Sequence, residues 1–315
     1  EDTPVTDTFF VYEDMDEISE YYYFVKAKND YMTSPASNLV HAYGITAPEA
    51  KEATEVDPDG PYTANWNPVP RATAYSVYTY KRTTLEEDQE NYNVVHEDFS
   101  KVNSEGTAFY PEYLGNYTEQ WPLDEYMESG GWLGINIALA EGYLGFSGYG
   151  EILSPYLDLS GNDGKYTVTV KFIGSIPGES FVVQGTTQYH LVPVTGDEQS
   201  VTLEFSDGAS NSLLYFYTQY GYADILIDEI TVQQDLLAGD HVYTPETMSD
   251  NIGSDNLSYR FSDLVRDDKN VDYAYRVFAC YNKFITDVAW SEASDAVVIN
   301  YNSSDTTLPE CPVPT

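Results

Sequence analysis

Basic residues and long apolar runs are both scarce in this sequence of 315 residues. Only 14 residues are Lys or Arg, against 52 that are Asp or Glu, which gives a formal net charge of -38. Nucleic-acid surfaces need Lys and Arg to neutralise phosphate, and anionic membrane headgroups attract basic segments. No apolar run reaches the roughly 18 residues of a membrane-spanning helix. The sequence therefore predicts no nucleic-acid partner and no membrane insertion.

Cysteine and the common catalytic motifs are also scarce. The two cysteines, Cys280 and Cys311, fit no metal-binding spacing, and the sequence leaves open whether they pair with each other. HExxH, Gly-x-Ser-x-Gly and phosphate-loop motifs are missing. A Ser-His-Asp triad of distant residues stays an alternative, because its members need not be neighbours in sequence. We expect a protein that is not an enzyme.

Helical periodicity is nearly missing, and alternation of apolar and polar residues takes its place. The apolar runs follow a period of two between clusters of Gly, Pro, Asn and Asp, which is typical of strands joined by turns. Thirty tyrosines favour strands and wet recognition surfaces. The sequence therefore predicts an all-β protein.

Two segments near opposite ends of the chain echo each other. Residues 23–29 and 275–282 both carry Tyr, Val and Ala at alternate positions, on one face of a strand. Each continues into a Ser-x-Ala-Ser stretch, at 34–37 and 291–294. This repeat predicts that two similar sandwiches end at these places.

A family resemblance extends this repeat. Residues 62–78 resemble strands B and C of fibronectin type III domains. Their sequence is Tyr-Thr-Ala-Asn-Trp-Asn-Pro-Val-Pro-Arg-Ala-Thr-Ala-Tyr-Ser-Val-Tyr. The two Tyr-x-Val-x-Ala strands resemble strand F of the same family. The resemblance implies one such sandwich split between 46–94 and 236–300, and the C-terminal strands of a preceding one in 1–45. The composition of 301–315 is typical of a linker.

The segment 95–235 is too long for a loop within a sandwich, so we expect it to form an inserted domain. It resembles the jelly-roll (galactose-binding-like) modules of bacterial surface proteins, including the cleaved-adhesin and carbohydrate-binding-like families. The resemblance is carried by Glu-Asp-Phe-Ser at 97–100, Gly-Trp at 131–132, and the lines at 152–160 and 225–232.

Two carboxylates in this segment predict a metal site. Glu97 and Asp228 each lie between apolar neighbours on strands that a jelly roll brings together. Only three basic residues, Lys101, Lys165 and Lys171, are available there for a salt bridge, so a bound calcium ion is the expected counter-charge. The resemblance also implies a structural calcium. The alternatives are hydrogen bonds to backbone amides, or a strand face that is wrong by one residue.

Aromatic residues in the same segment predict a glycan-binding surface, because sugars stack on flat rings. The loop 142–150 spaces its rings with glycines that leave them accessible. Trp132 is expected in the core instead. Tyr217 is a further candidate ring in this segment. The predicted ligand-binding residues are Trp121, Tyr143, Tyr149, Tyr220 and Tyr222.

The resulting hypothesis is a non-catalytic adhesion or binding module, secreted or at a bacterial cell surface, that is part of a longer multidomain chain. The expected partner is a glycan or glycoprotein, with the fibronectin-like parts acting as spacers. Two alternatives remain: an accessory region that targets a secreted protease or glycoside hydrolase to its substrate, and a structural stalk without a ligand.

Overall fold

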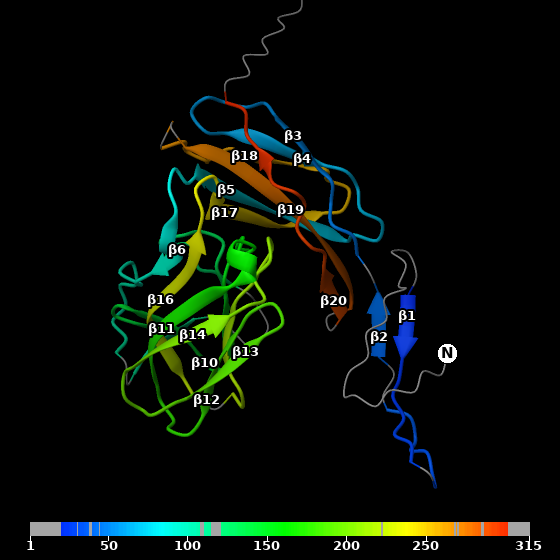
Figure 1. Ribbon diagram of the computed structural model, residues 1–315, viewed down its shortest axis with the longest axis vertical. Helices are drawn as coiled ribbons and strands as arrows, with labels where there is room; N and C mark the ends of the chain where they lie inside the picture. Colours follow the sequence, from blue (N-terminus) through cyan, green and yellow to red (C-terminus); the bar gives the residue numbers. More distant parts are fainter. Residues whose placement is uncertain are drawn as a thin grey trace, which may run out of the picture.

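The all-β class is confirmed. The computed structural model describes residues 20–29, 31–37, 40–43, 45–107, 110–114, 121–221, 223–267, 269, 271–284 and 287–301. These residues form strands β1 to β21 and one short 3-10 turn, η1 (Asn162–Gly164). Figure 1 shows two main bodies of strands, with the pair β1 (Glu20–Tyr23) and β2 (Val40–Tyr43) beside them. No described helix has the length and apolar character needed to cross a membrane.

The upper body in Figure 1, which we call the host sandwich, has two sheets. The smaller sheet has the order β18-β4-β3, from β3 (Ala50–Thr54), β4 (Tyr62–Trp66) and β18 (Ser258–Phe261). The larger has the order β17-β5-β19-β20, with β21 also paired to β19. Its strands are β5 (Ala74–Thr84), β17 (His241–Gly253), β19 (Asp272–Phe284), β20 (Asp287–Trp290) and β21 (Val297–Val298).

Residues from two segments far apart in the sequence, 62–77 and 252–299, fill the interior of the host sandwich. Trp66 packs against Tyr75 with ring centroids 5.4 Å apart, and Tyr62 packs against Tyr275 at 5.8 Å. The Tyr275 hydroxyl accepts a hydrogen bond from the Asn65 amide at 3.1 Å, which ties the two sheets together. Strands before and after the middle of the chain therefore enclose one core. The fibronectin type III assignment and the domain boundaries given above stay predictions.

The middle of the chain forms the second body, which we call the middle sandwich. Its strands are β6 (Gln89–Glu97), β7 (Glu112–Leu114), β8 (Trp121–Pro122), β9 (Leu133–Ala140), β10 (Tyr143–Leu153), β11 (Tyr166–Gly174), β12 (Ser180–Gln184), β13 (Tyr189–Pro193), β14 (Gln199–Phe205), β15 (Tyr215–Thr218) and β16 (Ile225–Leu236). They form one continuous 11-stranded sheet.

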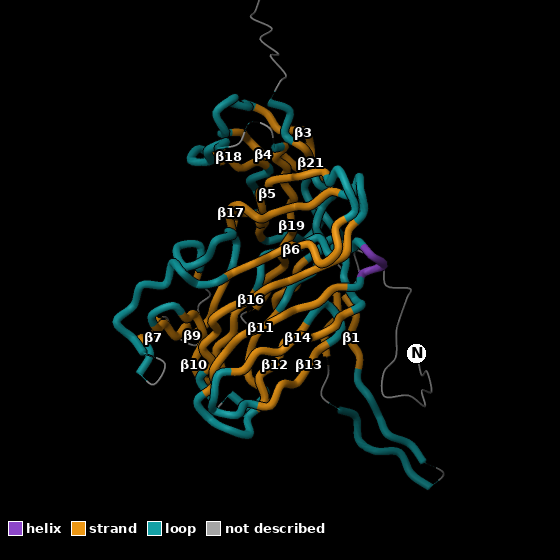
Figure 2. The backbone as a smooth tube through the Cα atoms, turned by 60° about the vertical axis from the view of Figure 1, so that its left-hand side comes forward, coloured by secondary structure: helices purple, strands orange, loops and turns teal. Residues whose placement is uncertain are grey.

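A change of partner along β10 folds this sheet into two layers. Residues 144–146 pair with β16, whereas residues 151–153 pair with β15, and an irregularity separates the two stretches. One layer is thus β6-β16-β11-β14, whose strands run side by side in Figure 2, and the other is β9-β10-β15-β12-β13. The core between the layers is rich in aromatic residues, among them the fully buried Trp132, Phe146, Phe172, Phe181 and Phe216.

The two sandwiches contact each other through a buried aromatic cluster. The Tyr156 ring of the middle sandwich stacks on Phe278 of β19, with centroids 3.9 Å apart, and meets Tyr78 of β5 edge-on. Beside them the buried Arg276 forms an ion pair with Asp158 at 2.9 Å. Because stacked rings and a buried charge pair fix the relative positions of their strands, these contacts hold the middle sandwich against the host sheet.

Two sequence predictions, on the pairing of Cys280 with Cys311 and on a linker at 301–315, concern residues that lie partly outside the described structure. Cys280 is buried in β19, and Cys311 lies outside the described residues, so their pairing stays open. The proposed linker 301–315 is described only at Tyr301.

Candidate functional site

The outward face of β15 and its neighbours carries a set of tyrosines. In β15 Phe216 points into the core, so Tyr215 and Tyr217 point outward by strand alternation. Two rows of side chains cross the layer at these positions. One row is Tyr189, Gln184, Tyr215 and Leu153, and the next is Leu191, Val182, Tyr217, Glu151 and Ile135. We call this surface the tyrosine face.

Hydrogen bonding on the tyrosine face leaves donors and acceptors free. The Tyr217 hydroxyl donates to Gln184 Oε1 at 2.8 Å, which orients the Gln184 amide and leaves its NH2 group available. Glu151 lies opposite Tyr217 on the neighbouring strand. Its carboxylate has no hydrogen-bond or ion-pair partner among the described residues, and burial raises its pKa. A carboxylate that has lost part of its hydration and has no protein partner needs a hydrogen-bond donor, and a ligand hydroxyl can supply one.

Two predicted ring residues stand at one end of this face. Tyr149 lies two residues before Glu151 on β10 and therefore on the same side of the strand, and it is 71% exposed. Its ring packs directly on Gly221, where an added Cβ would come within 2.3 Å of a ring carbon; the φ of Gly221 is +69°. Tyr220, next to this glycine, is 57% exposed. Glycine is therefore needed at position 221 both for the backbone and for the ring.

The other predicted ring residues do not join them in the described structure. Tyr143 lies at the opposite end of β10, where burial, together with Asp228 and Glu198, raises its pKa. Strand β8 places the backbone of Trp121 beside Gly134, and its side chain is outside the description. Tyr222 lies outside the described residues.

Glu97 is fully buried, and protein groups surround its carboxylate. The backbone amides of Glu128 and Ser129 donate to it at 2.6 and 2.9 Å, and the Ser129 hydroxyl donates as well. Burial raises the pKa of Glu97, with a smaller contribution from the charge of Glu128, and the three hydrogen bonds offset this only in part. The sequence analysis gave hydrogen bonds from backbone amides as the alternative to calcium, and Glu97 makes such bonds.

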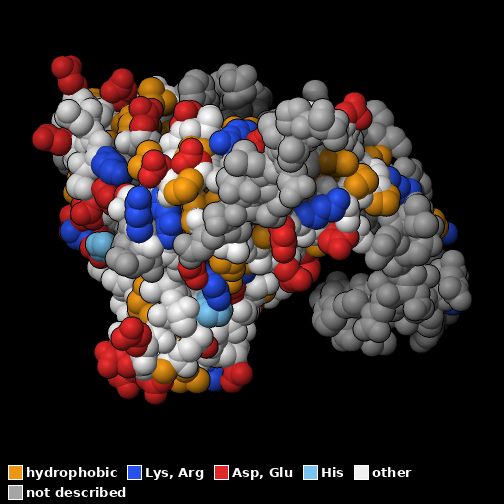
Figure 3. Space-filling view, turned by 90° about the horizontal axis from the view of Figure 1, so that it is seen from above, with side chains coloured by type: hydrophobic (Ala, Val, Ile, Leu, Met, Phe, Trp, Pro, Cys, Tyr) orange, Lys and Arg blue, Asp and Glu red, His pale blue; other side chains and the backbone are white. Residues whose placement is uncertain are grey.

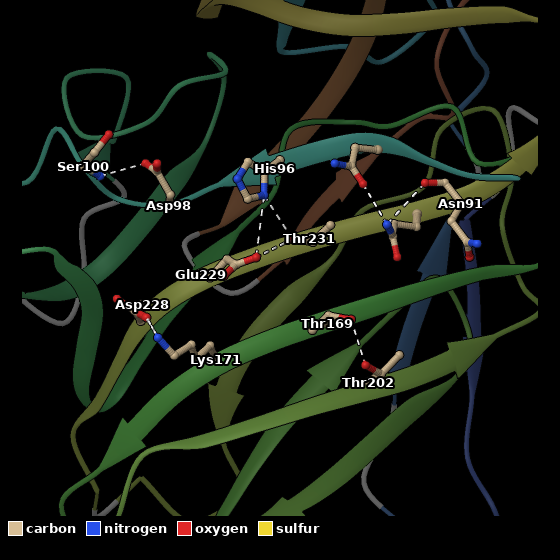
Figure 4. Close-up of polar contacts among 12 residues, drawn as sticks. Asn91, His96, Asp98, Ser100, Thr169, Lys171, Thr202, Asp228, Glu229 and Thr231 are labelled. Carbon is tan, nitrogen blue, oxygen red and sulfur yellow. Dashed lines mark hydrogen bonds and ion pairs between the residues drawn. The ribbon is translucent and has the colours of Figure 1, made fainter. Parts of the chain in front are cut away.

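Asp228 does not share the Glu97 environment. An irregularity in the pairing of β11 with β16 leaves Asp228 unpaired between Ile227 and Glu229, which shifts its side chain to the outer face. There it forms an ion pair with Lys171, as Figure 4 shows. One of the three lysines therefore supplies a counter-charge to Asp228, where the sequence favoured a calcium ion over a salt bridge. No cluster of three or more metal-ligating residues occurs in the described part of the chain, and calcium binding stays a prediction.

The outer face of the first layer is polar, and its side chains satisfy one another (Figure 4). The hydroxyls of Thr169 and Thr202 are 2.9 Å apart, and Thr231 lies 3.1 Å from His96 Nδ1. The Gln233 amide donates to Asn93 Oδ1 at 2.9 Å. We call this surface the polar face. Few of its central groups remain free for a ligand.

Several residues of the tyrosine face were not identified from sequence. Glu151 is one of 52 acidic residues, and nothing near it in the sequence marks it. Gln184 and Tyr189 acquire their positions only through the β12–β13 pairing. A signal did exist for Tyr215, because it shares a face with Tyr217 in any strand assignment.

No family model and no curated protein matches this chain. Among solved structures, it is similar to the CBM22-1 xylan-binding domain of Paenibacillus barcinonensis Xyn10C, with 18% identity and a TM-score of 0.29 over 48% of this chain and 98% of that one. It is also similar to the C-terminal CBM6 of LamC from Zobellia galactanivorans, with 12% identity and a TM-score of 0.25 over 49% and 99% of the two chains. Similarities of this size establish neither a shared family nor a shared ligand.

Proposed function

We propose that the protein is a non-catalytic module that binds neutral glycans on the tyrosine face. The observation that carries the proposal is the constellation of Tyr217, Gln184 and Glu151 on three neighbouring strands. It combines a ring, a hydrogen-bond donor and a hydrogen-bond acceptor within one rigid sheet. Polyhydroxylated ligands present both apolar C–H faces and hydroxyl groups, and need all three.

The tyrosines supply the stacking surface of the proposed site. Tyr215 and Tyr217 are half-buried, so the sheet limits the movement of their rings. Tyr189, at the edge of the sheet, is 62% exposed. Rigid rings lose little conformational entropy when a ligand binds, which favours affinity.

The charge of the protein restricts the class of glycan. A net charge of -38 repels polyanionic polysaccharides at a distance, and acidic side chains lie at many points of the surface in Figure 3. The tyrosine face itself contributes the carboxylate of Glu151 and no Lys or Arg. Both features favour neutral sugars over uronic-acid or sulfated chains.

The remaining parts of the hypothesis follow from this binding role. The module acts outside the cell, where polymeric glycans and glycoproteins are found, and the fibronectin-like host sandwich is a spacer. The Tyr156–Phe278 stack and the Arg276–Asp158 pair support the spacer role, because they hold the binding module in a fixed orientation. A calcium ion remains a further element of the hypothesis, without support from the contacts of Glu97 and Asp228.

Titration calorimetry with neutral hexasaccharides of xylose and of glucose tests the proposal. We expect saturable binding by the whole chain and at least a tenfold loss of affinity in Tyr217→Ala, since one stacked ring contributes roughly 1–3 kcal/mol on other ligands. Tyr143→Ala is the matched control, because this tyrosine belongs to the same domain but lies away from the tyrosine face.

Two results would contradict the proposal. One is the lack of binding to every neutral hexasaccharide by a folded sample, which would favour a stalk without a ligand. The other is equal loss of affinity in Tyr217→Ala and Tyr143→Ala, which would show that the ligand occupies another surface.

A further inference from the structure

A groove crosses the seam where the two layers of the middle sandwich meet at their free edges. Strands β13 and β14 end the continuous sheet and have no backbone ladder with each other. Side chains bridge them instead: His190 Nε2 lies 2.9 Å from the Glu204 carbonyl oxygen, and the Gln188 amide bonds to Ser206. The groove has a volume of about 700 Å³. Ligand-binding pockets fall within about 300–1,000 Å³.

Free polar groups of both kinds line this groove. The Thr167 hydroxyl, the Lys165 ammonium group and the Glu204 carboxylate all border it. None of the three makes a side-chain hydrogen bond or ion pair with another described residue. This distinguishes the groove from the neighbouring polar face, where Thr169 is already paired with Thr202. The groove therefore offers donors and acceptors that only water or a ligand satisfies.

The wall of the groove is preorganised. Asp207 accepts hydrogen bonds from the backbone amides of Thr187 and Gln188 at 2.6 and 2.7 Å, and from the Tyr166 hydroxyl at 3.1 Å. The Tyr166 ring stacks on Phe205 with centroids 5.0 Å apart. These contacts fix the turn between β12 and β13. Burial raises the pKa of Asp207, but the hydrogen bonds from Thr187, Gln188 and Tyr166 together outweigh it, so the pKa is lowered. A site held in this way loses little entropy when it binds a ligand.

Charge and aromatic content indicate the class of ligand. Lys165 is the only Lys or Arg that lines the described groove. Its positive charge is outweighed by the negative charges of Glu204 and Asp235, so an anionic ligand gains no electrostatic stabilisation there. Tyr189 lines the groove as well as the tyrosine face, and it supplies an exposed ring. A ring, hydroxyls, amides and one carboxylate together fit a neutral sugar.

The geometry points to a second neutral-glycan site in this groove, built on Thr167, Glu204 and Tyr189 and separate from the Tyr217 site. The inference rests on the proposed function for its ligand class. Two sites on one rigid domain, sharing Tyr189 at their border, bind adjacent chains or adjacent parts of one chain. Binding at two sites raises the overall affinity for a polymer above that for an oligosaccharide.

Amide chemical-shift mapping of the whole chain with xylotriose and cellotriose distinguishes the two sites. We expect saturable shifts both at residues 215–217 and at residues 233–235, which line the groove on β16 and are not part of the tyrosine face. In Tyr217→Ala the shifts at 233–235 should persist. In the double variant Thr167→Val and Glu204→Ala they should weaken by at least about tenfold in affinity, while those at 215–217 remain. Glu198→Ala, an exposed carboxylate outside the groove, is the control.

The outcomes separate the two claims. Shifts confined to 215–217 in the wild-type chain would overturn the groove site and leave the proposed function standing. Loss of the shifts at 233–235 in Tyr217→Ala would also overturn it, because the two places would then form one site. No shift at either place with any neutral sugar would overturn the proposed function and this inference together.

Discussion

The polar face and the tyrosine face belong to the same sandwich, but they differ in whether the protein itself supplies hydrogen-bond and ion-pair partners for their polar side chains. On the polar face Thr169 pairs with Thr202, Thr231 pairs with His96, and Lys171 neutralises Asp228. On the tyrosine face Glu151 has no partner in the described structure, and burial raises its pKa. The first arrangement stabilises the fold without a ligand, and the second leaves an unsatisfied acceptor that a ligand completes.

The comparison suggests how to separate structural from functional polar residues in a chain with so many acids. Burial alone does not separate them, because Glu97 is more buried than Glu151 and nonetheless has three donors around it. The distinguishing feature is whether the protein supplies the partners. The predictions below test that distinction.

The largest expected effect is on stability, in Glu97→Ala. Removing the buried carboxylate leaves the part-buried amides of Glu128 and Ser129, and the Ser129 hydroxyl, without an acceptor, so we expect the free energy of unfolding to fall by about 3 kcal/mol. Glu151→Ala, the matched variant, should change it by less than about 1 kcal/mol. Urea unfolding of both variants measures the difference. Equal losses would contradict the assignment of separate roles.

An intermediate effect is expected on binding, in Glu151→Ala. Loss of the acceptor should weaken the binding of a neutral hexasaccharide by about tenfold, or ~1.4 kcal/mol. The effect should also depend on pH. The ionised carboxylate is the better acceptor, so affinity should fall as pH is lowered, and it should begin to fall above the range in which an ordinary glutamate titrates, because burial raises the pKa of Glu151.

Glu151→Gln provides the control for this pH dependence, because an amide keeps an acceptor oxygen without titrating. We expect calorimetry of this variant to give a flat affinity profile between mild acid and neutral pH. A flat profile in the wild-type chain would mean that Glu151 does not contact the ligand in its ionised form.

The all-β class followed from the sequence, but the faces of individual residues did not. Alternation correctly indicates strands such as β11, in which Val168, Val170 and Phe172 all enter the core. Tyr143 and Tyr149 were grouped because one glycine-spaced loop contains them. The structure places them in one long strand whose irregularity sends each to a different layer.

The same cause explains the outcome for the expected metal ligands. Asp228 was placed on the face of Ile230 by counting every second residue. The irregularity opposite Lys171 inserts one extra residue into β16, so the alternation of faces shifts by one. Asp228 therefore points to the outer face, where it pairs with Lys171. Irregularities of this kind depend on the pairing of strands far apart in sequence, so a single sequence carries little signal for them.

The smallest expected effect is in Lys171→Met. The Lys171 and Asp228 side chains are 37% and 26% exposed, and ion pairs at such positions contribute little to stability. We expect a much smaller stability change than in Glu97→Ala and unchanged glycan affinity. Thermal unfolding in calcium and in EDTA tests the calcium ion of the hypothesis, because an ion that binds the folded chain raises its midpoint. A midpoint that rises with calcium in the wild type, and rises further once Lys171 no longer competes for Asp228, would support the metal site predicted from sequence. Equal midpoints in calcium and in EDTA would contradict it.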